Sequence, residues 1–196
     1  AIFGMWYYAR YEGNFLPSPK KTFNPMMLMA IVILVPGTQF AANFIANLTG
    51  YIRPDWLQQY NELFETSGIT DTTFVTVLYS VILAPICEEL IFRGVTMRCA
   101  RKALPFALAN LMQAALFGLF HLNWIQGIYA FALGIVLGYV CECGGSIYYS
   151  MGLHMLFNLW GTLSGFFPDP GNSVVVFVVV IVVTIVSLVV GFVLFN

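Results

Sequence analysis

Three short polar motifs carry the residues that could do chemistry in this chain of 196 residues. The first contains two adjacent glutamates and an arginine, and the other two each contain one of the two histidines of the chain. A general base, two imidazoles and a carboxamide are sufficient to hydrolyse an amide bond with an activated water. The candidate site residues are Glu88, Glu89, Arg93, His121, His154 and Asn158.

The spacing of the first motif predicts different roles for its two carboxylates. On a helix, Glu89 and Arg93 share a face and can pair, whereas Glu88 points about 100 degrees away. We therefore expect Arg93 to hold Glu89 in a structural ion pair and Glu88 to face a cavity as a base. An apolar, water-poor site makes a carboxylate a better proton acceptor. Pro85, just before the motif, is expected to bend the helix and free a backbone carbonyl.

The other two motifs supply the partners of that base. His121 shares a helical face with Phe117, and His154 shares one with Asn158. Glu88 would deprotonate a water, and His121 would hold that water or relay its proton. His154 and Asn158 would donate hydrogen bonds to the oxyanion. Taken singly, an intramembrane histidine or asparagine more often binds a neighbouring helix.

A divalent metal is the alternative to metal-free catalysis. Two histidines and a carboxylate form a legitimate three-ligand zinc set, here Glu88, His121 and His154. Using Glu88 as a ligand would remove the best base, while Glu89 is expected to be occupied by Arg93. The preferred interpretation therefore requires no cofactor.

The elements that position these residues are predicted to be membrane helices. The chain is 60% hydrophobic and 9% charged, with a mean hydropathy of +0.84. A bilayer core of about 30 Å needs about 20 apolar residues per helix. The fold class is therefore all-α, a transmembrane bundle forming one domain over residues 24–196, after an N-terminal stub and cytoplasmic segment at 1–23. Six spans are predicted at about 24–48, 73–97, 103–122, 124–141, 146–167 and 173–195.

The basic residues predict an orientation. Two groups of them lie before the first span and between the second and third, and the positive-inside rule places both in the cytoplasm. The loop over residues 50–71 then faces outward. Residues 1–9 are apolar but too short to span, which fits an interfacial segment or the end of a truncated helix. The two basic groups are Arg10, Lys20 and Lys21, and Arg98, Arg101 and Lys102.

Three further patterns concern packing. Gln39, Asn43 and Asn47 form a polar stripe on the first span, which indicates a face turned toward protein or a cavity. Gly134 and Gly138 have the spacing that lets two helices approach closely. The last span is dominated by valine and is expected to be a lipid-facing anchor.

The depths of the site residues do not match in straight, upright helices. Counted from the basic loop after the second span, Glu88 lies about 15 Å deep, His154 about 12 Å and His121 about 27 Å. A shared site therefore requires that the third span begins outside the bilayer, that it tilts strongly, or that the helix bends after Pro85.

The ordered motifs resemble a known family. Glu88-Glu89-x-x-x-Arg93, Phe117-x-x-x-His121 and His154-x-x-x-Asn158 look like the signature motifs of the CAAX prenyl protease and bacteriocin-processing (CPBP, or Abi) family. The resemblance covers about residues 73–165 and includes Gly94 and Ser146. It implies an all-helical, glutamate-dependent intramembrane endopeptidase. By this resemblance Glu88 is the base, Glu89 and Arg93 support it, His121 positions water, and His154 with Asn158 stabilises the oxyanion.

The expected substrate is a peptide or lipidated peptide, either of the prenylated CAAX type or of the bacteriocin or pheromone type. Membrane lipid is the other expected partner, and a net charge of -1 gives no indication of nucleic-acid binding. The location is expected to be a prokaryotic cell membrane, by likeness to the smaller family members. The alternative function is a non-enzymatic bacteriocin-immunity protein or a proton-coupled carrier.

Overall fold

The computed structural model describes residues 24–67, 73–164 and 173–195, and these residues form helices without any strand. The all-α prediction is therefore confirmed for this part of the chain, while the N-terminal stub lies outside it. One long helix, Phe74–Arg101, alternates between α-helical and π-helical turns. The helices are α3 (Pro25–Ile52), α4 (Pro54–Ser67), α5 (Phe74–Val77), η1 (Leu78–Leu83), α6 (Ala84–Glu89), η2 (Leu90–Met97), α7 (Arg98–Arg101), α8 (Phe106–Phe120), α9 (Trp124–Cys143), α10 (Ile147–Ser164) and α11 (Val174–Phe195).

Helices occur at all six predicted spans, and four of them are long and apolar enough to cross a membrane. These four are α3, the long helix Phe74–Arg101, α9 and α11. The third predicted span is shorter than expected, because α8 has only 15 residues. At 1.5 Å per residue it is about 22 Å long, less than the thickness of the hydrocarbon core.

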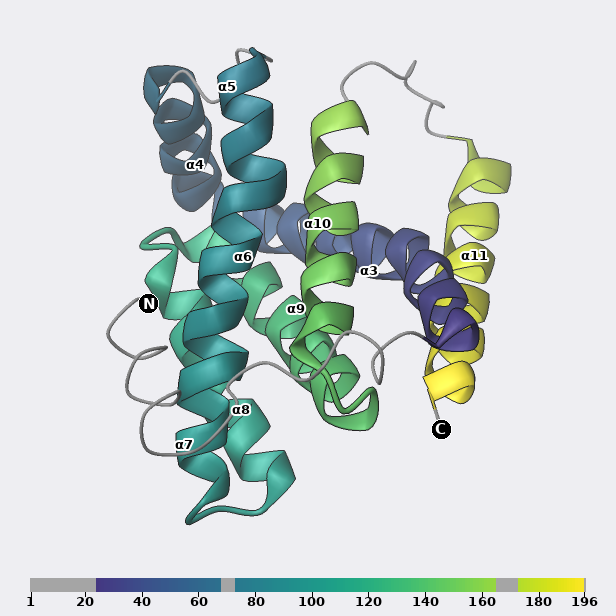
Figure 1. The fold of residues 1–196 in the computed structure, drawn as a ribbon. Coiled ribbons are helices and arrows are strands. Elements are labelled where there is room, and N and C mark those ends of the chain that lie inside the picture. Colours follow the sequence, from purple (N-terminus) through teal and green to yellow (C-terminus); the bar gives the residue numbers. More distant parts are fainter. Residues whose placement is uncertain (1–23, 68–72, 165–172, 196) are drawn as a thin grey trace.

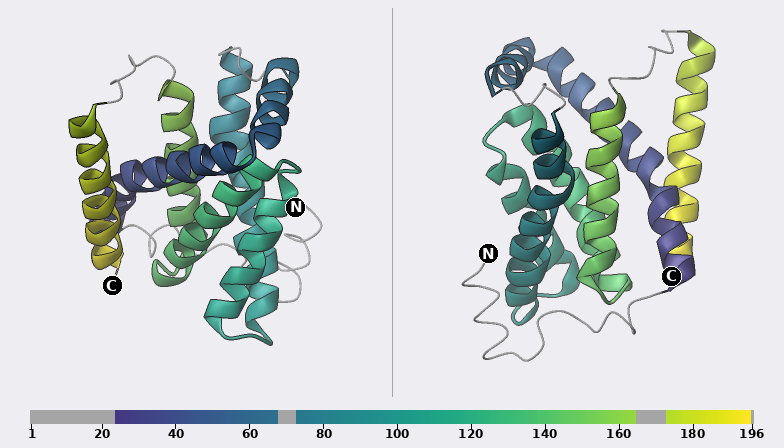
Figure 2. Two further views of the ribbon diagram at one scale, coloured as in Figure 1. Left: turned by 180° about the vertical axis from the view of Figure 1, so that it is seen from behind. Right: turned by 45° about the horizontal axis from the view of Figure 1, so that its top comes forward.

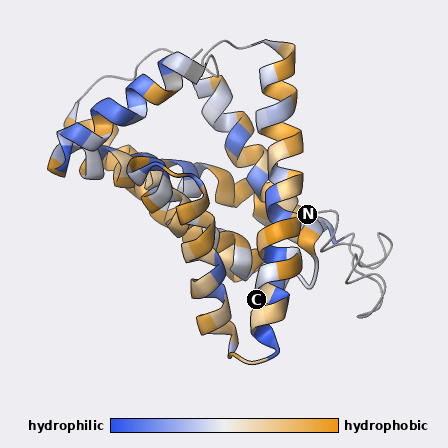
Figure 3. Cartoon of the chain, turned by 90° about the vertical axis from the view of Figure 1, so that its left-hand side faces the viewer, coloured by the Kyte–Doolittle hydropathy of each residue, from blue (hydrophilic) through white to orange (hydrophobic). Residues whose placement is uncertain are grey.

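The segment predicted as an outer loop is largely helical. Helix α3 extends to Ile52, and α4 follows after Arg53. Pro54 at the first position and Asp55 in the first turn both favour a helix start, which the loop prediction did not weigh. Figure 3, coloured by hydropathy, shows that most residues of the helices are hydrophobic and that hydrophilic residues are in the minority.

Helix α3 crosses behind α6 and α10 and reaches α11 at the side of the molecule (Figures 1 and 2). A hydroxyl from α11 holds the bend near Pro36: Ser187 Oγ accepts from the Gly37 N–H at 2.8 Å and donates to the Ile33 carbonyl. Ser187 thereby bridges two backbone groups, the N–H of residue 37 and the carbonyl of residue 33, that an α-helix pairs directly. Helix α11 is therefore more than a lipid-facing anchor, since Ser187, Gly191 and Phe195 form a buried edge.

Small residues bring α8 and α9 into close contact, as predicted. A Cβ atom at Gly134 would lie 3.0 Å from the backbone of Ala114, and one at Gly118 would lie 2.5 Å from the carbonyl oxygen of Gly127. Such distances leave no room for a methyl group. This contact matters for the site, because α8 carries His121 at its end.

Candidate active site

The paired glutamates lie midway along the long helix and are buried to different extents. The Glu89 and Arg93 side chains are fully buried, and Arg93 Nη1 donates to Glu89 Oε1 at 2.8 Å. The Glu88 side chain keeps 17% of its exposure. The predicted ion pair is therefore confirmed, and Glu88 is the carboxylate that reaches open space.

That open space is a cavity of about 900 Å³. Glu88, His121, His154 and Asn158 all line it, although they come from three different helical segments. The structure thus brings together the four residues that were predicted to act directly. Glu89 and Arg93 are not among its lining residues.

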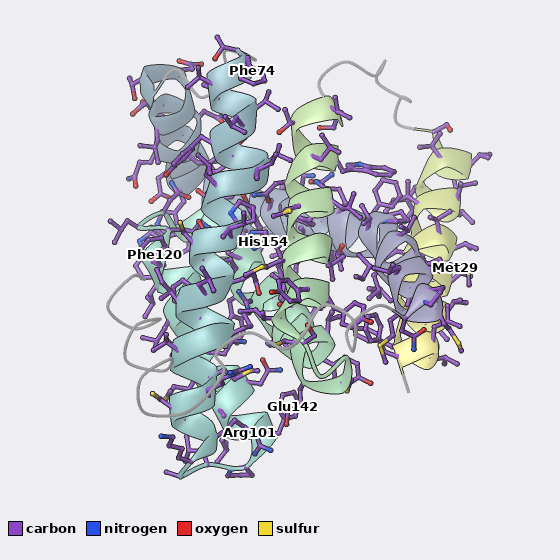
Figure 4. The ribbon with its side chains drawn as sticks, in the orientation of Figure 1. Met29, Phe74, Arg101, Phe120, Glu142 and His154 are labelled. Atoms are coloured by element: carbon purple, nitrogen blue, oxygen red, sulfur yellow. The ribbon has the colours of Figure 1, made fainter. Side chains whose placement is uncertain are left out.

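His154, labelled in Figure 4, contacts both glutamates of the long helix. Its Nδ1 lies 2.9 Å from Glu89 Oε1, and its Nε2 lies 3.7 Å from Glu88 Oε2. Because an ionised carboxylate only accepts, the hydrogen of the shorter contact is on Nδ1. The contact with Glu89 was not predicted, since the motif spacing within one helix says nothing about a third helix.

His121 is the last residue of its segment and caps the end of α8. Its Nδ1 lies 2.8 Å from the carbonyl oxygen of Phe117. Because a carbonyl oxygen only accepts hydrogen bonds, Nδ1 carries the hydrogen and donates it. The other ring nitrogen, Nε2, then carries a lone pair. The Phe117 ring packs edge-on against both imidazoles, with ring centroids 5.0 Å from His121 and 5.7 Å from His154.

The predicted mismatch in depth is resolved by the ends of the helices. Glu88 lies 13 residues before Arg101, where the long helix ends, and His121 lies 15 residues after Phe106, where α8 begins. At 1.5 Å per residue these distances are about 20 and 23 Å, so the two residues reach similar heights. The turn between α9 and α10 lies higher than the turn between α7 and α8 (Figure 1). His154 is level with Glu88, because its Nε2 lies 3.7 Å from Glu88 Oε2. The alternative in which the third span begins outside the bilayer stays a prediction.

Asn158 binds a carbonyl that the backbone leaves without a donor. Its Nδ2 donates to the Ser80 carbonyl at 2.8 Å. Ser80 lies in the π-helical turn η1, where the donor would come from residue 85. That residue is proline, which has no N–H. The freed carbonyl predicted from Pro85 is therefore present, five residues earlier in the chain.

Arg93 joins three helices at the base of the site. Besides Glu89, its guanidinium donates through Nη2 to the Gly134 carbonyl of α9 at 3.1 Å. It also lies over the Phe117 ring of α8, with Cζ 4.6 Å from the ring centroid. Gln113 donates to the same Gly134 carbonyl at 2.9 Å. This buried polar layer closes the site below Glu88.

Several cavity residues were not predicted as part of a site. Tyr60 of α4 and Tyr129 of α9 line the cavity, and so do Gln39 and Asn43 of α3. The polar stripe had indicated a cavity for these last two, whereas Asn47 is exposed and does not line it. The tyrosines gave no signal, because aromatic residues are common throughout this sequence.

The alternative metal set of Glu88, His121 and His154 is not an assembled metal-binding group in the described part of the chain. Within residues 24–67, 73–164 and 173–195, no group of three histidine, cysteine, aspartate or glutamate side chains is arranged to hold a metal ion. His154 Nδ1 is engaged by Glu89 Oε1, and its Nε2 lies 3.7 Å from Glu88 Oε2.

The fold and site define a helical membrane protein whose ionisable groups converge on one internal cavity. Residues 70–160 match the family model described as type II CAAX prenyl endopeptidase Rce1-like. This stretch of the chain thus matches a protease family, the one that the motif resemblance indicated. Comparison with curated proteins and with solved structures found no match.

Proposed function

We propose that this chain is an intramembrane endopeptidase that uses a glutamate-activated water. Glu88 takes a proton from the water, whose oxygen attacks the peptide carbonyl. The Nε2 lone pair of His121 accepts a hydrogen bond from the same water and orients it. The proton on Glu88 then passes to the leaving nitrogen as the carbon–nitrogen bond breaks.

The oxyanion of the tetrahedral intermediate requires hydrogen-bond donors. Asn158 uses one Nδ2 hydrogen on Ser80 and retains a second for the oxyanion. His154 serves through Nε2, which must carry a hydrogen for this role because the Nδ1 hydrogen is used on Glu89. One such donor stabilises a transition state by about 2.7 to 4 kcal/mol.

The observation that carries the proposal is the convergence of Glu88, His121, His154 and Asn158 on one cavity. A proton-coupled carrier would instead need ionisable groups along a path that opens to both sides. The match of residues 70–160 to a protease family also favours hydrolysis over an immunity or carrier function. We further propose catalysis without a metal and a prokaryotic membrane as the location.

Prenylated CAAX-type peptides and bacteriocin- or pheromone-type peptides are both candidate substrates. The family description favours the first class. The cavity is lined by both polar and apolar side chains. No single lining residue therefore selects between the two classes of peptide.

The test is cleavage of prenylated and unprenylated peptides by the purified protein. Glu88→Gln and Glu88→Ala are expected to lower the rate by about 10²–10⁴-fold, the usual contribution of a general base. Glu142→Gln is the matched control, because Glu142 lies outside the cavity and pairs with Arg101. Activity is expected to persist in a chelator. Full activity in both Glu88 variants would remove Glu88 as the base.

A further inference from the structure

Helix α3 forms one wall of the active-site cavity. Four of its residues line the cavity and share one face of the helix, and we call them the α3 wall: Gln39, Ala42, Asn43 and Ala46. The groups proposed to react come instead from the long helix, the end of α8 and α10. The position of the α3 wall therefore affects the room for a substrate rather than the contacts among the reacting groups.

The α3 wall begins just after a bend in the helix. Helix α3 lies beside α11 before the bend and crosses the molecule toward α4 after it (Figures 1 and 2). Pro36 cannot donate a backbone hydrogen bond within the helix. Thr38 Oγ1 donates to the carbonyls of Leu34 and Val35, each at 2.9 Å, a pattern that often bends helices. Gln39 follows directly, so the bend determines where the wall lies.

A hydroxyl from α11 bridges this bend. Ser187 Oγ accepts from the Gly37 N–H at 2.8 Å and donates to the Ile33 carbonyl. The absence of a side chain at residue 37 makes this approach feasible, because a Cβ atom there would lie 2.6 Å from Ser187 Oγ. The hydroxyl of one helix and the glycine of the other are therefore matched to each other.

Helix α11 holds this hydroxyl in place by close packing. A Cβ atom at Gly191, one turn after Ser187, would lie 2.5 Å from the Leu34 side chain of α3. Thr184, one turn before Ser187, behaves differently, since its hydroxyl donates to the Val180 carbonyl of its own helix at 2.7 Å. Thr184 is therefore a hydroxyl on the same helix that can serve as a control.

We propose that Ser187 is a positioning residue for the active-site cavity, because it fixes the bend of α3 and thereby the place of the α3 wall. With the bridge removed, the Gly37 N–H and the Ile33 carbonyl pair directly as in a regular α-helix, and the bend relaxes. A peptide substrate then meets a displaced wall and binds less tightly. The effect on the substrate rests on the proposed peptidase function, whereas the effect on α3 does not.

The displacement is large enough to measure. Asn47 lies ten residues after Gly37, which is about 15 Å along the helix. A change of about 20° in the bend therefore moves Asn47 by about 5 Å. Asn47 is exposed and lies outside the cavity, so it can carry a probe without contacting a substrate.

The position of α3 is tested by the distance between two spin labels, measured by double electron–electron resonance. The native cysteines are first replaced by serine or alanine, and the labels are attached at Asn47→Cys on α3 and Leu163→Cys on α10, which is also exposed. Ser187→Ala is expected to change this distance by several ångströms. Gly37→Ala displaces the hydroxyl from the other helix and should also change the distance, whereas Thr184→Val should not. An unchanged distance in Ser187→Ala would overturn the proposal.

Cleavage of prenylated and unprenylated peptides tests the consequence for the substrate. Ser187→Ala is expected to raise KM about 2- to 12-fold, the effect of losing one neutral hydrogen bond, with kcat within about 2-fold of the wild type. An unchanged KM in a variant whose α3 has moved would overturn the role of Ser187 in substrate positioning. A changed spin-label distance with no cleavage even by the wild type would support the control of α3 by Ser187 and refute the peptidase function.

Discussion

Removing the Glu89 carboxylate is expected to destabilise the protein strongly. Glu89→Ala leaves the fully buried Arg93 without its 2.8 Å partner and His154 without its 2.9 Å partner. Breaking one side of a buried ion pair costs about 3 to 5 kcal/mol. For a chain of this size each kcal/mol lowers the melting temperature by about 2–4 °C, so the expected decrease is about 6 to 20 °C.

Thermal unfolding of the purified protein in detergent measures this decrease, and a double variant separates its causes. Glu89→Ala combined with Arg93→Met removes both charges, so it should be more stable than the sum of the two single changes predicts. A smaller effect is expected for Glu89→Gln, which keeps the shape and one acceptor. Glu89→Ala that melts like the wild type but has no activity would refute the structural role and make Glu89 a catalytic candidate.

Three further predictions follow from the contacts around the site. Asn158→Ala should cost about 1 to 3 kcal/mol in unfolding free energy by leaving the Ser80 carbonyl unpaired, and Pro85→Ala in the same chain should recover part of it by restoring a backbone donor, as measured by thermal melts. Gly118→Ala should cost about 1–3 kcal/mol, because its methyl group would meet a backbone carbonyl of α9, and a melt like that of the wild type would contradict this packing. The Trp124 ring stacks on Trp56 of α4, with ring centroids 5.3 Å apart. Trp124→Ala should therefore loosen the attachment of α4 and make proteolysis within α4 faster, whereas an unchanged rate would show that other contacts hold α4.

The sequence predicted the helices well where hydropathy was sufficient and less well where a polar segment had its own helical signals. The long runs of apolar residues identified α3, α9 and α11 to within a few residues. Helix α4 was missed, although Pro54 and Asp55 are typical of a helix start. Helix α8 begins at Phe106 rather than at about residue 103, because the chain turns between Arg101 and Phe106 instead of beginning the next helix at once.

The site was predictable within each helix and much less so between helices. The pairing of Glu89 with Arg93 depends only on a spacing of four residues. The freed carbonyl was likewise predictable from Pro85, but the π-helical turn that selects Ser80 and the donor from Asn158 depend on two helices meeting. The relative depths of Glu88 and His121 depend on where two helices end, and hydropathy does not determine such ends to within a turn.

His154 connects the two carboxylates that helix geometry separates. Its Nδ1 binds Glu89 and its Nε2 faces Glu88, so the supporting pair and the proposed base share one imidazole. A change at Glu89 therefore affects the proposed site in two ways. Arg93 loses its ion-pair partner, and the His154 ring loses the contact that fixes its orientation. Reduced activity in a destabilised Glu89 variant is then no evidence that Glu89 exchanges a proton with the substrate. The decisive comparison is between Glu88→Gln and Glu89→Gln at matched stability, because only the Glu88 side chain reaches the cavity where water and peptide can meet.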